Sequence, residues 1–234
     1  MIDKKLVEQR FKKSLKTYRD NAFIQKYTAE KLISLLPGRN YGSILEIGCG
    51  AGILTEQIKE KLVFSKFACI DLVLESKEYV DKIIPGSIFK AGDIEKIELS
   101  GKYDLIISNA ALQWCENFEK TIEKLFLSLN KNGILAVSAF GNNNLKELKT
   151  VLNLPDAMKT DIKGIEEEKV FYFDSPVDIL KHLKYTGANA LFGYKFTKSA
   201  LQSFEERYRS LYSREGKVYL TYNPLYFVKA GPAG

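Results

Sequence analysis

The stretch Ser43-Ile44-Leu45-Glu46-Ile47-Gly48-Cys49-Gly50-Ala51-Gly52 decides the fold of this chain. Its first half is apolar and strand-like, and its second half carries three glycines at alternate positions before a helical pattern that begins at Ile53. Glycine adopts positive φ without strain and lets another group lie against bare backbone. The stretch therefore predicts a strand, a tight turn and a helix whose amino terminus faces a bound small molecule.

The spacing of this turn argues against a dinucleotide as the ligand. A dinucleotide fingerprint has its third glycine three positions after the second, where this chain has Ile53. Glu46 would repel a pyrophosphate, whereas a carboxylate suits a ligand with positive charge. S-adenosylmethionine carries a sulfonium and an ammonium group, and we predict that it is the cofactor.

Length and composition predict a single domain over residues 1–234. A chain of 234 residues with 45% hydrophobic content is long enough for one α/β domain with a substantial core. The polar segment 1–10 does not resemble a signal sequence, and the apolar runs are far shorter than the roughly 20 residues of a membrane-spanning helix. We therefore expect a cytoplasmic protein that does not associate with membranes.

Charge and cysteine content narrow the classes of partner. The net charge of +6 favours encounter with acidic partners, either nucleic acid or an acidic carrier protein. No Arg/Gly-rich tail, zinc finger or aromatic-stacking signature supports nucleic acid, so we expect none to bind. Cys49, Cys69 and Cys115 have neither metal-ligand spacing nor an even count, which predicts reduced, buried thiols and no metal site.

Hydrophobic periodicity predicts alternating strands and helices in the middle of the chain. Residues 3–36 have the pattern of one continuous helix, which Pro37-Gly38 ends. The alternation that follows predicts a doubly wound α/β fold, with a mostly parallel sheet and helices on both faces. The expected strands are 43–47, 66–70, 87–90, 103–108 and 134–140, the expected helices are 53–62, 74–82, 117–129, 144–153, 176–185 and 198–212, and one or two further strands are expected in 217–229.

Polar groups stand where each of the first four predicted strands ends. In doubly wound sheets the ligand lies beyond the carboxyl ends of the strands, where strand order reverses. Asp71 would accept both ribose hydroxyls, Asp93 would accept from the adenine amine, and Ile94 would pack on the ring. Alternatively, the carboxylates could cap helices and the glycines could form only a structural turn, but their joint order favours a cofactor site. The predicted cofactor-binding residues are Glu46, Gly48, Gly50, Gly52, Asp71, Leu72, Asp93, Ile94, Ser108 and Asn109.

On these residues the chain resembles class I S-adenosylmethionine-dependent methyltransferases. A narrower likeness, to the malonyl-acyl-carrier-protein O-methyltransferases of biotin synthesis, covers nearly the whole chain. Its most specific parts are the Ala111-Leu112-Gln113-Trp114-Cys115 run and the Leu220-Thr221-Tyr222 run. The other similar segments are 10–25, 140–148 and 180–189.

The resemblance implies a Rossmann-like sheet of seven strands in one methyltransferase domain. Within it we expect an N-terminal helical lid at 1–36, a cofactor-binding core at 43–140, and a C-terminal helical insertion with final strands, facing substrate and carrier, in 141–234. The implied reaction methylates the free carboxylate of a malonyl thioester on acyl carrier protein and leaves S-adenosylhomocysteine. Because an apolar fatty-acid synthesis channel disfavours a charge, the ester primes pimeloyl synthesis for biotin. We expect a monomer.

A carboxylate acceptor explains why the pattern lacks a catalytic histidine. Its pKa of roughly 4 leaves it ionised at neutral pH, so attack on the methyl group needs no general base. His182, the only histidine, is expected to be a surface or packing residue. Tyr18 and Gln25 are predicted to face the methyl group, with Trp114 as the opposite wall, although Tyr18 and Trp114 could be simple core packing.

Recognition of the carrier is expected to be electrostatic, because carrier proteins present an acidic helix and a flexible phosphopantetheine arm. The lysine-rich segment 180–196 and the helix 198–214 are the predicted docking surface, with a solvated helix face as the alternative. The candidates for contact with the acceptor carboxylate or the carrier are Arg10, Lys16, Lys146 and Lys181.

Three other functions fit parts of the pattern. A carboxyl methyltransferase for a small free acid such as trans-aconitate has a similar run after the fourth strand. A cofactor-binding regulatory protein without turnover is the second, and the intact cofactor pattern argues against it. Nucleic-acid methylation is the third, but the Ser108-Asn109 run lacks the Pro-Pro-Tyr-like motif typical of amino-methylating enzymes.

Overall fold

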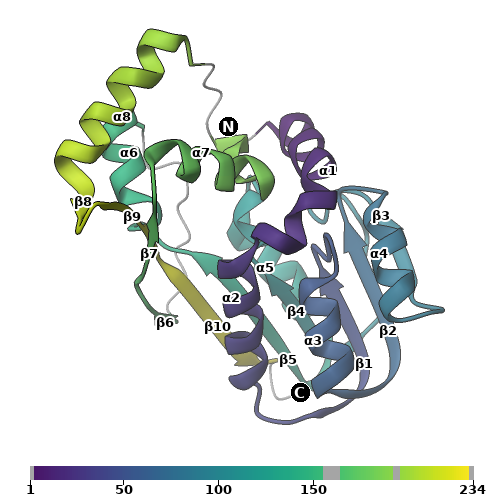
Figure 1. Cartoon of the computed structure of the whole chain (residues 1–234). Helices are drawn as coiled ribbons and strands as arrows, with labels where there is room; N and C mark the ends of the chain where they lie inside the picture. The colour runs from purple at the N-terminus through teal and green to yellow at the C-terminus, as the bar shows by residue number, and fades with distance from the viewer. Residues whose placement is uncertain (1–2, 155–163, 192–195, 232–234) are drawn as a thin grey trace.

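A seven-stranded sheet forms the centre of the molecule (Figure 1). The computed structural model describes residues 3–154, 164–191 and 196–231. Five strands run parallel, and the last two of the order are antiparallel to their neighbours, which confirms the expected doubly wound α/β sheet. The strands follow the order β3 (Ile88–Ala91), β2 (Val63–Asp71), β1 (Asn40–Ile47), β4 (Tyr103–Asn109), β5 (Leu129–Phe140), β10 (Pro224–Ala230) and β6 (Ile165–Glu166).

The central strands β1, β4 and β5 are buried on both faces, as their continuous apolar runs predict, whereas the edge strands β3 and β6 are largely exposed. Along β1, the side chain of Ile44 belongs to one core cluster, while Leu45 and Ile47 belong to another on the opposite face. Helices α2 (Phe23–Ser34), α3 (Ile53–Lys61) and α4 (Ser76–Ile83) pack in the first cluster, and α5 (Phe118–Leu127) packs in the second. The sheet is therefore a middle layer that holds its strand ends in fixed positions.

Strand order reverses between β1 and β4. Ile47 pairs with Ser108 in the parallel register, so both strands end at the same edge of the sheet. The glycine turn follows β1 there, and a short helix η1 (Leu112–Trp114) follows β4. This is the place where doubly wound sheets bind ligands.

The amino-terminal segment is two helices, so the expectation of one continuous helix over 3–36 is wrong. Helix α1 (Lys4–Asn21) ends at Ala22, whose φ of −86° and ψ of 49° break the helical path before α2. Ala22 is fully buried, and neither glycine nor proline marks the break. Tertiary packing sets it, because α2 joins the core of the sheet while α1 turns away across the strand ends (Figure 1).

The carboxyl-terminal region contains a second sheet that the sequence did not predict. Strands β7 (Lys169–Phe173), β9 (Lys217–Tyr222) and β8 (Ser213–Arg214) form it, and β9 pairs antiparallel with both neighbours. The expected helices are present as α6 (Lys146–Leu152), α7 (Pro176–Tyr185) and α8 (Lys198–Tyr212), with a short η2 (Ala188–Leu191). The insertion is thus helices packed on a small sheet rather than helices alone.

Two sequence segments that carried the narrower resemblance meet in this region. The buried carboxylate of Glu147 accepts a hydrogen bond from the backbone N–H of Thr221 at 2.9 Å and another from the Thr221 hydroxyl. A buried carboxylate is stable only when hydrogen bonds satisfy it, so this contact ties α6 to β9. Within the described residues, no helix has the length and apolar character needed to cross a membrane.

Candidate functional site

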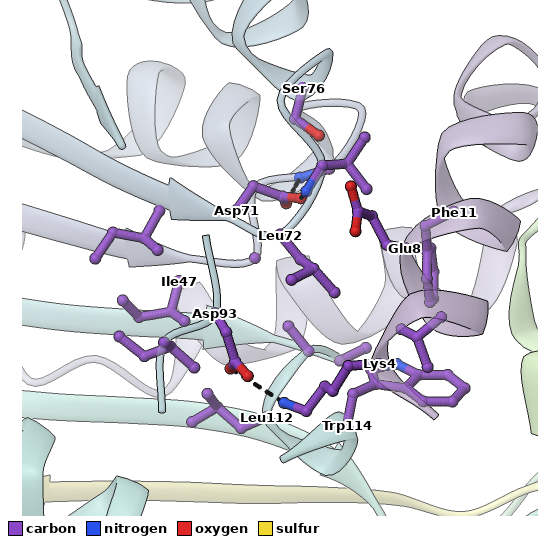
Figure 2. Close-up of a pocket in the computed structure, with 18 of the residues that line it drawn as sticks. Lys4, Glu8, Phe11, Ile47, Asp71, Leu72, Ser76, Asp93, Leu112 and Trp114 are labelled. Carbon is purple, nitrogen blue, oxygen red and sulfur yellow. Dashed lines mark hydrogen bonds and ion pairs between the residues drawn. The ribbon is translucent and has the colours of Figure 1, made fainter. Parts of the chain in front are cut away.

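A cavity of about 120 Å³ lies at the ends of β1, β2 and β4, beneath α1. Figure 2 shows that side chains from α1 enter it from one side and those of the strand ends from the other. Of the predicted cofactor residues, seven line it: Gly48, Gly50, Asp71, Leu72, Asp93, Ile94 and Asn109. The strand-end reasoning therefore brought together residues that are far apart in the sequence.

The glycines of the turn are required for different reasons. A Cβ on Gly48 would lie 2.2 Å from the Cβ of Ala111, so this glycine lets the turn after β1 touch the loop after β4. Gly50 has no atom within 4 Å of its Cβ position and has a φ of +50°, so its backbone faces open space in the cavity wall. Only Gly50 has the bare, accessible backbone that the approach of a ligand needs.

Asp71, at the end of β2, fastens the glycine turn to the next loop. Its Oδ2 accepts from the Gly50 backbone N–H at 2.7 Å, and its Oδ1 accepts from the Val73 N–H at 2.7 Å. Burial raises the pKa of Asp71, while these two bonds act in the opposite direction. Asp71 also lines the cavity, so its carboxylate oxygens face the space that a ligand would occupy.

Asp93 is already paired with a residue that the sequence reasoning missed. The Lys4 ammonium, from the first turn of α1, lies 3.1 Å from Asp93 Oδ1 (Figure 2). It also lies 2.7 Å from Glu95 Oε2. Burial lowers the pKa of Lys4, but the bonds to both carboxylates outweigh it and raise that pKa overall. Lys4 thus fastens the start of α1 over the end of the pocket at which adenine was expected. The one sequence signal for this contact was a lysine in the first turn of the predicted helix. With 35 lysines and arginines in the chain, that signal did not single out Lys4.

Four predicted site residues lie behind the pocket wall. Glu46, Gly52, Ser108 and Gln25 are buried and do not line the cavity. Glu46 accepts from Thr55 Oγ1 at 2.7 Å, its other oxygen has no partner among the described residues, and burial raises its pKa to about 8. Ser108 Oγ donates to the Ile47 carbonyl at 2.9 Å. These residues shape the turn from behind.

Gln25, predicted to face the methyl group, has a different place in the structure. Its backbone carbonyl accepts from Asn109 Nδ2 at 3.0 Å, and its side-chain oxygen is buried without a partner. Asn109 lines the pocket and also accepts from Ser138 Oγ. Gln25 therefore fixes the orientation of the Asn109 amide and stands one residue removed from the cavity.

Aromatic side chains line the side of the pocket next to α1, with Trp114 beside Lys4 (Figure 2). Phe11 from α1 packs edge-on against Trp114 from η1, with ring centroids 5.4 Å apart, and Tyr18 also lines the cavity. Trp114 Nε1 is buried and has no hydrogen-bond partner among the described residues. Burial, together with the nearby Asp71 carboxylate, raises the pKa of Tyr18, so its hydroxyl stays protonated. This side therefore offers hydrogen-bond donors and no base.

His182 is a packing residue, as expected, but it is buried rather than exposed. Its ring stacks on Phe23 at 4.4 Å, and its Nε2 lies 2.7 Å from the Tyr222 hydroxyl. Burial lowers its pKa to about 4, and it does not line the cavity. The three cysteines are free and buried, and the described residues contain no cluster of three or more His, Cys, Asp or Glu side chains able to hold a metal ion.

The cavity is small for a cofactor of nucleotide size. Small-molecule pockets usually have volumes of about 300 to 1,000 Å³, compared with about 120 Å³ here. Six lining residues come from α1, namely Lys4, Val7, Glu8, Phe11, Leu15 and Tyr18. The position of α1 therefore determines how much room the pocket has.

Comparison with known proteins places this geometry in a family. The family model described as a methyltransferase domain matches residues 18–189. A malonyl-[acyl-carrier protein] O-methyltransferase from Calditerrivibrio nitroreducens is 38% identical over 234 residues, which cover 93% of this chain and 93% of that protein.

Solved structures confirm the fold. The YcgJ protein from Bacillus subtilis superposes with a TM-score of 0.58 at 12% identity, over 89% of this chain and 99% of that one. The N-methyltransferase NodS from Bradyrhizobium japonicum, solved in complex with S-adenosyl-L-homocysteine, gives a TM-score of 0.52 at 19% identity over 68% of this chain and 89% of that one.

Proposed function

The chain belongs to the malonyl-[acyl-carrier protein] O-methyltransferase family, and from this premise we propose that it methylates the free carboxylate of malonyl-acyl carrier protein with S-adenosylmethionine. The methyl ester would then prime pimeloyl synthesis for biotin. We further propose that the chain acts as one cytoplasmic, monomeric domain, with α1 as its lid.

The pocket fits S-adenosylmethionine on two observations. Gly50 presents open backbone in the turn before α3, and the buried Asp71 carboxylate lines the cavity beside it. Asp93 and Ile94 line the adjacent wall, where an adenine amine would replace the Lys4 ammonium as donor to Asp93. The pocket residues thus supply acceptors for the hydroxyl and amine groups of the nucleoside.

The observation that carries the proposed acceptor is the unpaired Nε1 of Trp114. A buried N–H without an acceptor costs about 1–3 kcal/mol, and an indole N–H can only donate. It lies in the pocket wall next to α1, so a carboxylate oxygen of the acceptor would satisfy it. The protonated Tyr18 hydroxyl, which makes no hydrogen bond with the described residues, offers a second donor to the same anion.

The residues at this end bind and orient the acceptor rather than remove a proton. S-adenosylmethionine, when bound, supplies an electrophilic methyl group, whose bond to sulfur breaks as a carboxylate oxygen of the acceptor takes the methyl. A malonyl carboxylate is already ionised at neutral pH, so no proton transfer is needed. Phe11 and Trp114 exclude water from the reacting atoms, and the donors hold the oxygen in line.

Labelled S-adenosylmethionine and three acceptors test this function. The purified protein should form a methyl ester with malonyl-acyl carrier protein, and less efficiently with malonyl-coenzyme A. Free aconitate should stay unmethylated. Methylation of aconitate with no ester on either thioester would replace the proposed substrate by a small free acid, and absence of any product would refute the methyltransferase assignment.

A further inference from the structure

The outer face of α1 is rich in lysine, with one exposed carboxylate, Asp20, a turn beyond Lys16. Lys5, Lys12, Lys13 and Lys16 are exposed on it. Lys12 pairs with Glu75, whereas the other three make no ion pair with the described residues. A row of unpaired ammonium groups above a binding pocket produces a local positive potential that attracts an acidic partner.

The carboxyl end of α7 extends this basic face. Thr17 Oγ1 donates to the Tyr185 carbonyl at 3.0 Å, which joins the middle of α1 to the last turn of α7. A Cβ on Gly187 would lie 2.9 Å from Ser14 Oγ, so the two segments are in close contact. The exposed Lys184, also without an ion pair to the described residues, therefore stands beside the α1 lysines.

This seam between α1 and α7 lies directly behind the aromatic end of the pocket. A Cβ on Gly187 would lie 3.0 Å from Phe11 Cδ1, and Phe11 packs on Trp114. One aromatic ring thus separates the seam from the proposed acceptor end. A flexible arm that arrives at the seam needs only a shift of Phe11 to reach Trp114.

Helix α8 is a poorer docking surface, although the sequence pointed to it. Its basic residues alternate with acidic ones, including Glu205 and Glu206, and it contributes no lining residue to the pocket. Figure 1 shows α8 at the far side of α7 from α1. Two of the other predicted candidates are engaged, since Lys146 pairs with Glu168 and Lys181 pairs with Asp178, whereas Arg10 is partly exposed and makes no ion pair with the described residues. Part of the predicted segment 180–196, residues 192–195, lies outside the described residues.

We propose that the basic surface formed by Lys13, Lys16 and Lys184 docks the acidic face of the acyl carrier protein, so that its acyl arm enters the pocket at the seam between α1 and α7. This inference rests on the proposed function, and charge complementarity is its basis. Lys13 and Lys16 belong to α1, the proposed lid. Docking of the carrier and movement of the lid away from the pocket therefore involve the same helix.

A charge-reversal experiment tests this surface. The docking variant is Lys13→Glu, Lys16→Glu and Lys184→Glu together. The matched control is Lys61→Glu, Lys198→Glu and Arg214→Glu, three exposed residues without ion pairs to the described residues and away from the seam. Equilibrium binding of malonyl-acyl carrier protein is measured at low and moderate salt, and KM and kcat are measured for malonyl-carrier and for malonyl-coenzyme A.

The docking variant should bind the carrier at least about tenfold more weakly than wild type, with a smaller salt dependence, and the control should stay within about threefold. Its KM should rise much more for malonyl-carrier than for the smaller malonyl-coenzyme A, and kcat with malonyl-coenzyme A should stay at the wild-type value, which establishes that the variant is folded.

Unchanged carrier binding in the docking variant, or an equal loss in the control, would overturn the inference. The inference would also be overturned if single-stranded RNA bound the wild-type protein more tightly than the carrier does and this binding were lost in the docking variant. Failure of the proposed function is separate, because it would appear as absent ester formation by wild type whatever the binding results.

Discussion

Two sets of pocket residues use their polar groups in opposite ways: the strand-end carboxylates, called the cofactor end, and the aromatic residues beside α1, called the acceptor end. At the cofactor end, Asp71 and Asp93 are hydrogen-bonded to neighbouring protein groups, and the backbone of the turn is fixed by the sheet below it. At the acceptor end, Trp114 Nε1 and the Tyr18 hydroxyl have no partner in the described residues, and aromatic rings surround them. The first end is preorganised through its own contacts, whereas the second is left with unused donors.

This difference separates what each end is able to recognise. The cofactor end presents acceptors, which suit the hydroxyl, amine and cationic groups of S-adenosylmethionine. The acceptor end presents donors without a base, which suits an anion that is already deprotonated. Mutations at the two ends should therefore affect different kinetic constants.

The largest expected effect comes from Asp71→Ala at the cofactor end. The change leaves the N–H groups of Gly50 and Val73 without their acceptor, at about 1–3 kcal/mol for an unsatisfied buried group, and removes the proposed ribose contacts. We expect the Kd for S-adenosylmethionine to rise by a factor of about 10 to 100, measured by calorimetry. Asp174→Ala, at a side chain that is 84% exposed, is the control. An unchanged Kd in Asp71→Ala would remove Asp71 from the site.

Trp114→Phe sharpens the contrast from the acceptor end. It keeps an aromatic ring against Phe11 but removes the Nε1 donor, so kcat/KM for malonyl-carrier should fall about tenfold, as for the loss of one hydrogen bond to a charged group. The Kd for S-adenosylmethionine should stay near the wild-type value. A loss of cofactor affinity with intact kcat would place Trp114 at the wrong end of the pocket.

Tyr18→Phe should act in the same direction with a smaller effect. The change removes one neutral hydroxyl donor to the anion and keeps the ring in place, so a loss of roughly threefold to fivefold in kcat is expected. Steady-state kinetics measure the change in kcat, and titration of the same preparation with S-adenosylmethionine measures any change in its Kd. Wild-type kcat in the variant would return Tyr18 to a packing role.

The smallest effect is expected from Lys4→Met at the adenine end. Partly exposed ion pairs contribute about 0–1 kcal/mol, so the melting temperature should hardly change. Without the ammonium, α1 is fastened less tightly, and hydrogen exchange in residues 4–21 of the cofactor-free protein should speed up by at most about fivefold. Lys5→Met, on the outer face of the same helix, is the control, and equal exchange in both variants would contradict a fastening role for Lys4.

The cofactor end was predictable from sequence because its signals are local. The glycine spacing, Asp71 and Asp93 each follow a strand directly, and parallel strands bring their carboxyl ends to one edge. Why position 48 requires glycine was not predictable, because the requirement comes from the close approach of Ala111, in a loop far away in the sequence. The position of Gln25 was not predictable either, because it depends on the angle at which α2 meets β4.

The covering elements were less predictable because long-range packing sets them. No residue type marks the break at Ala22. The strand at 169–173 was not predicted, because its place in the fold comes from antiparallel pairing with β9. Lys4 was one lysine among many until the fold placed it beside two carboxylates. The narrower resemblance pointed to Trp114, which lines the pocket, although it did not reveal that the indole N–H has no partner among the described residues.

The central claim is that the acceptor end binds a ready-made anion and needs no base, and the pH dependence of single-turnover methyl transfer to malonyl-carrier tests it most directly. The buried His182 has a pKa of about 4 and Glu46 one of about 8, but neither side chain lines the pocket, so neither is in a position to take a proton from the acceptor. We predict a rate that is constant between about pH 5.5 and 7.5, above the ordinary pKa of a carboxylate. A rate that rises tenfold per pH unit toward a midpoint in that range would reveal a catalytic base and contradict this account.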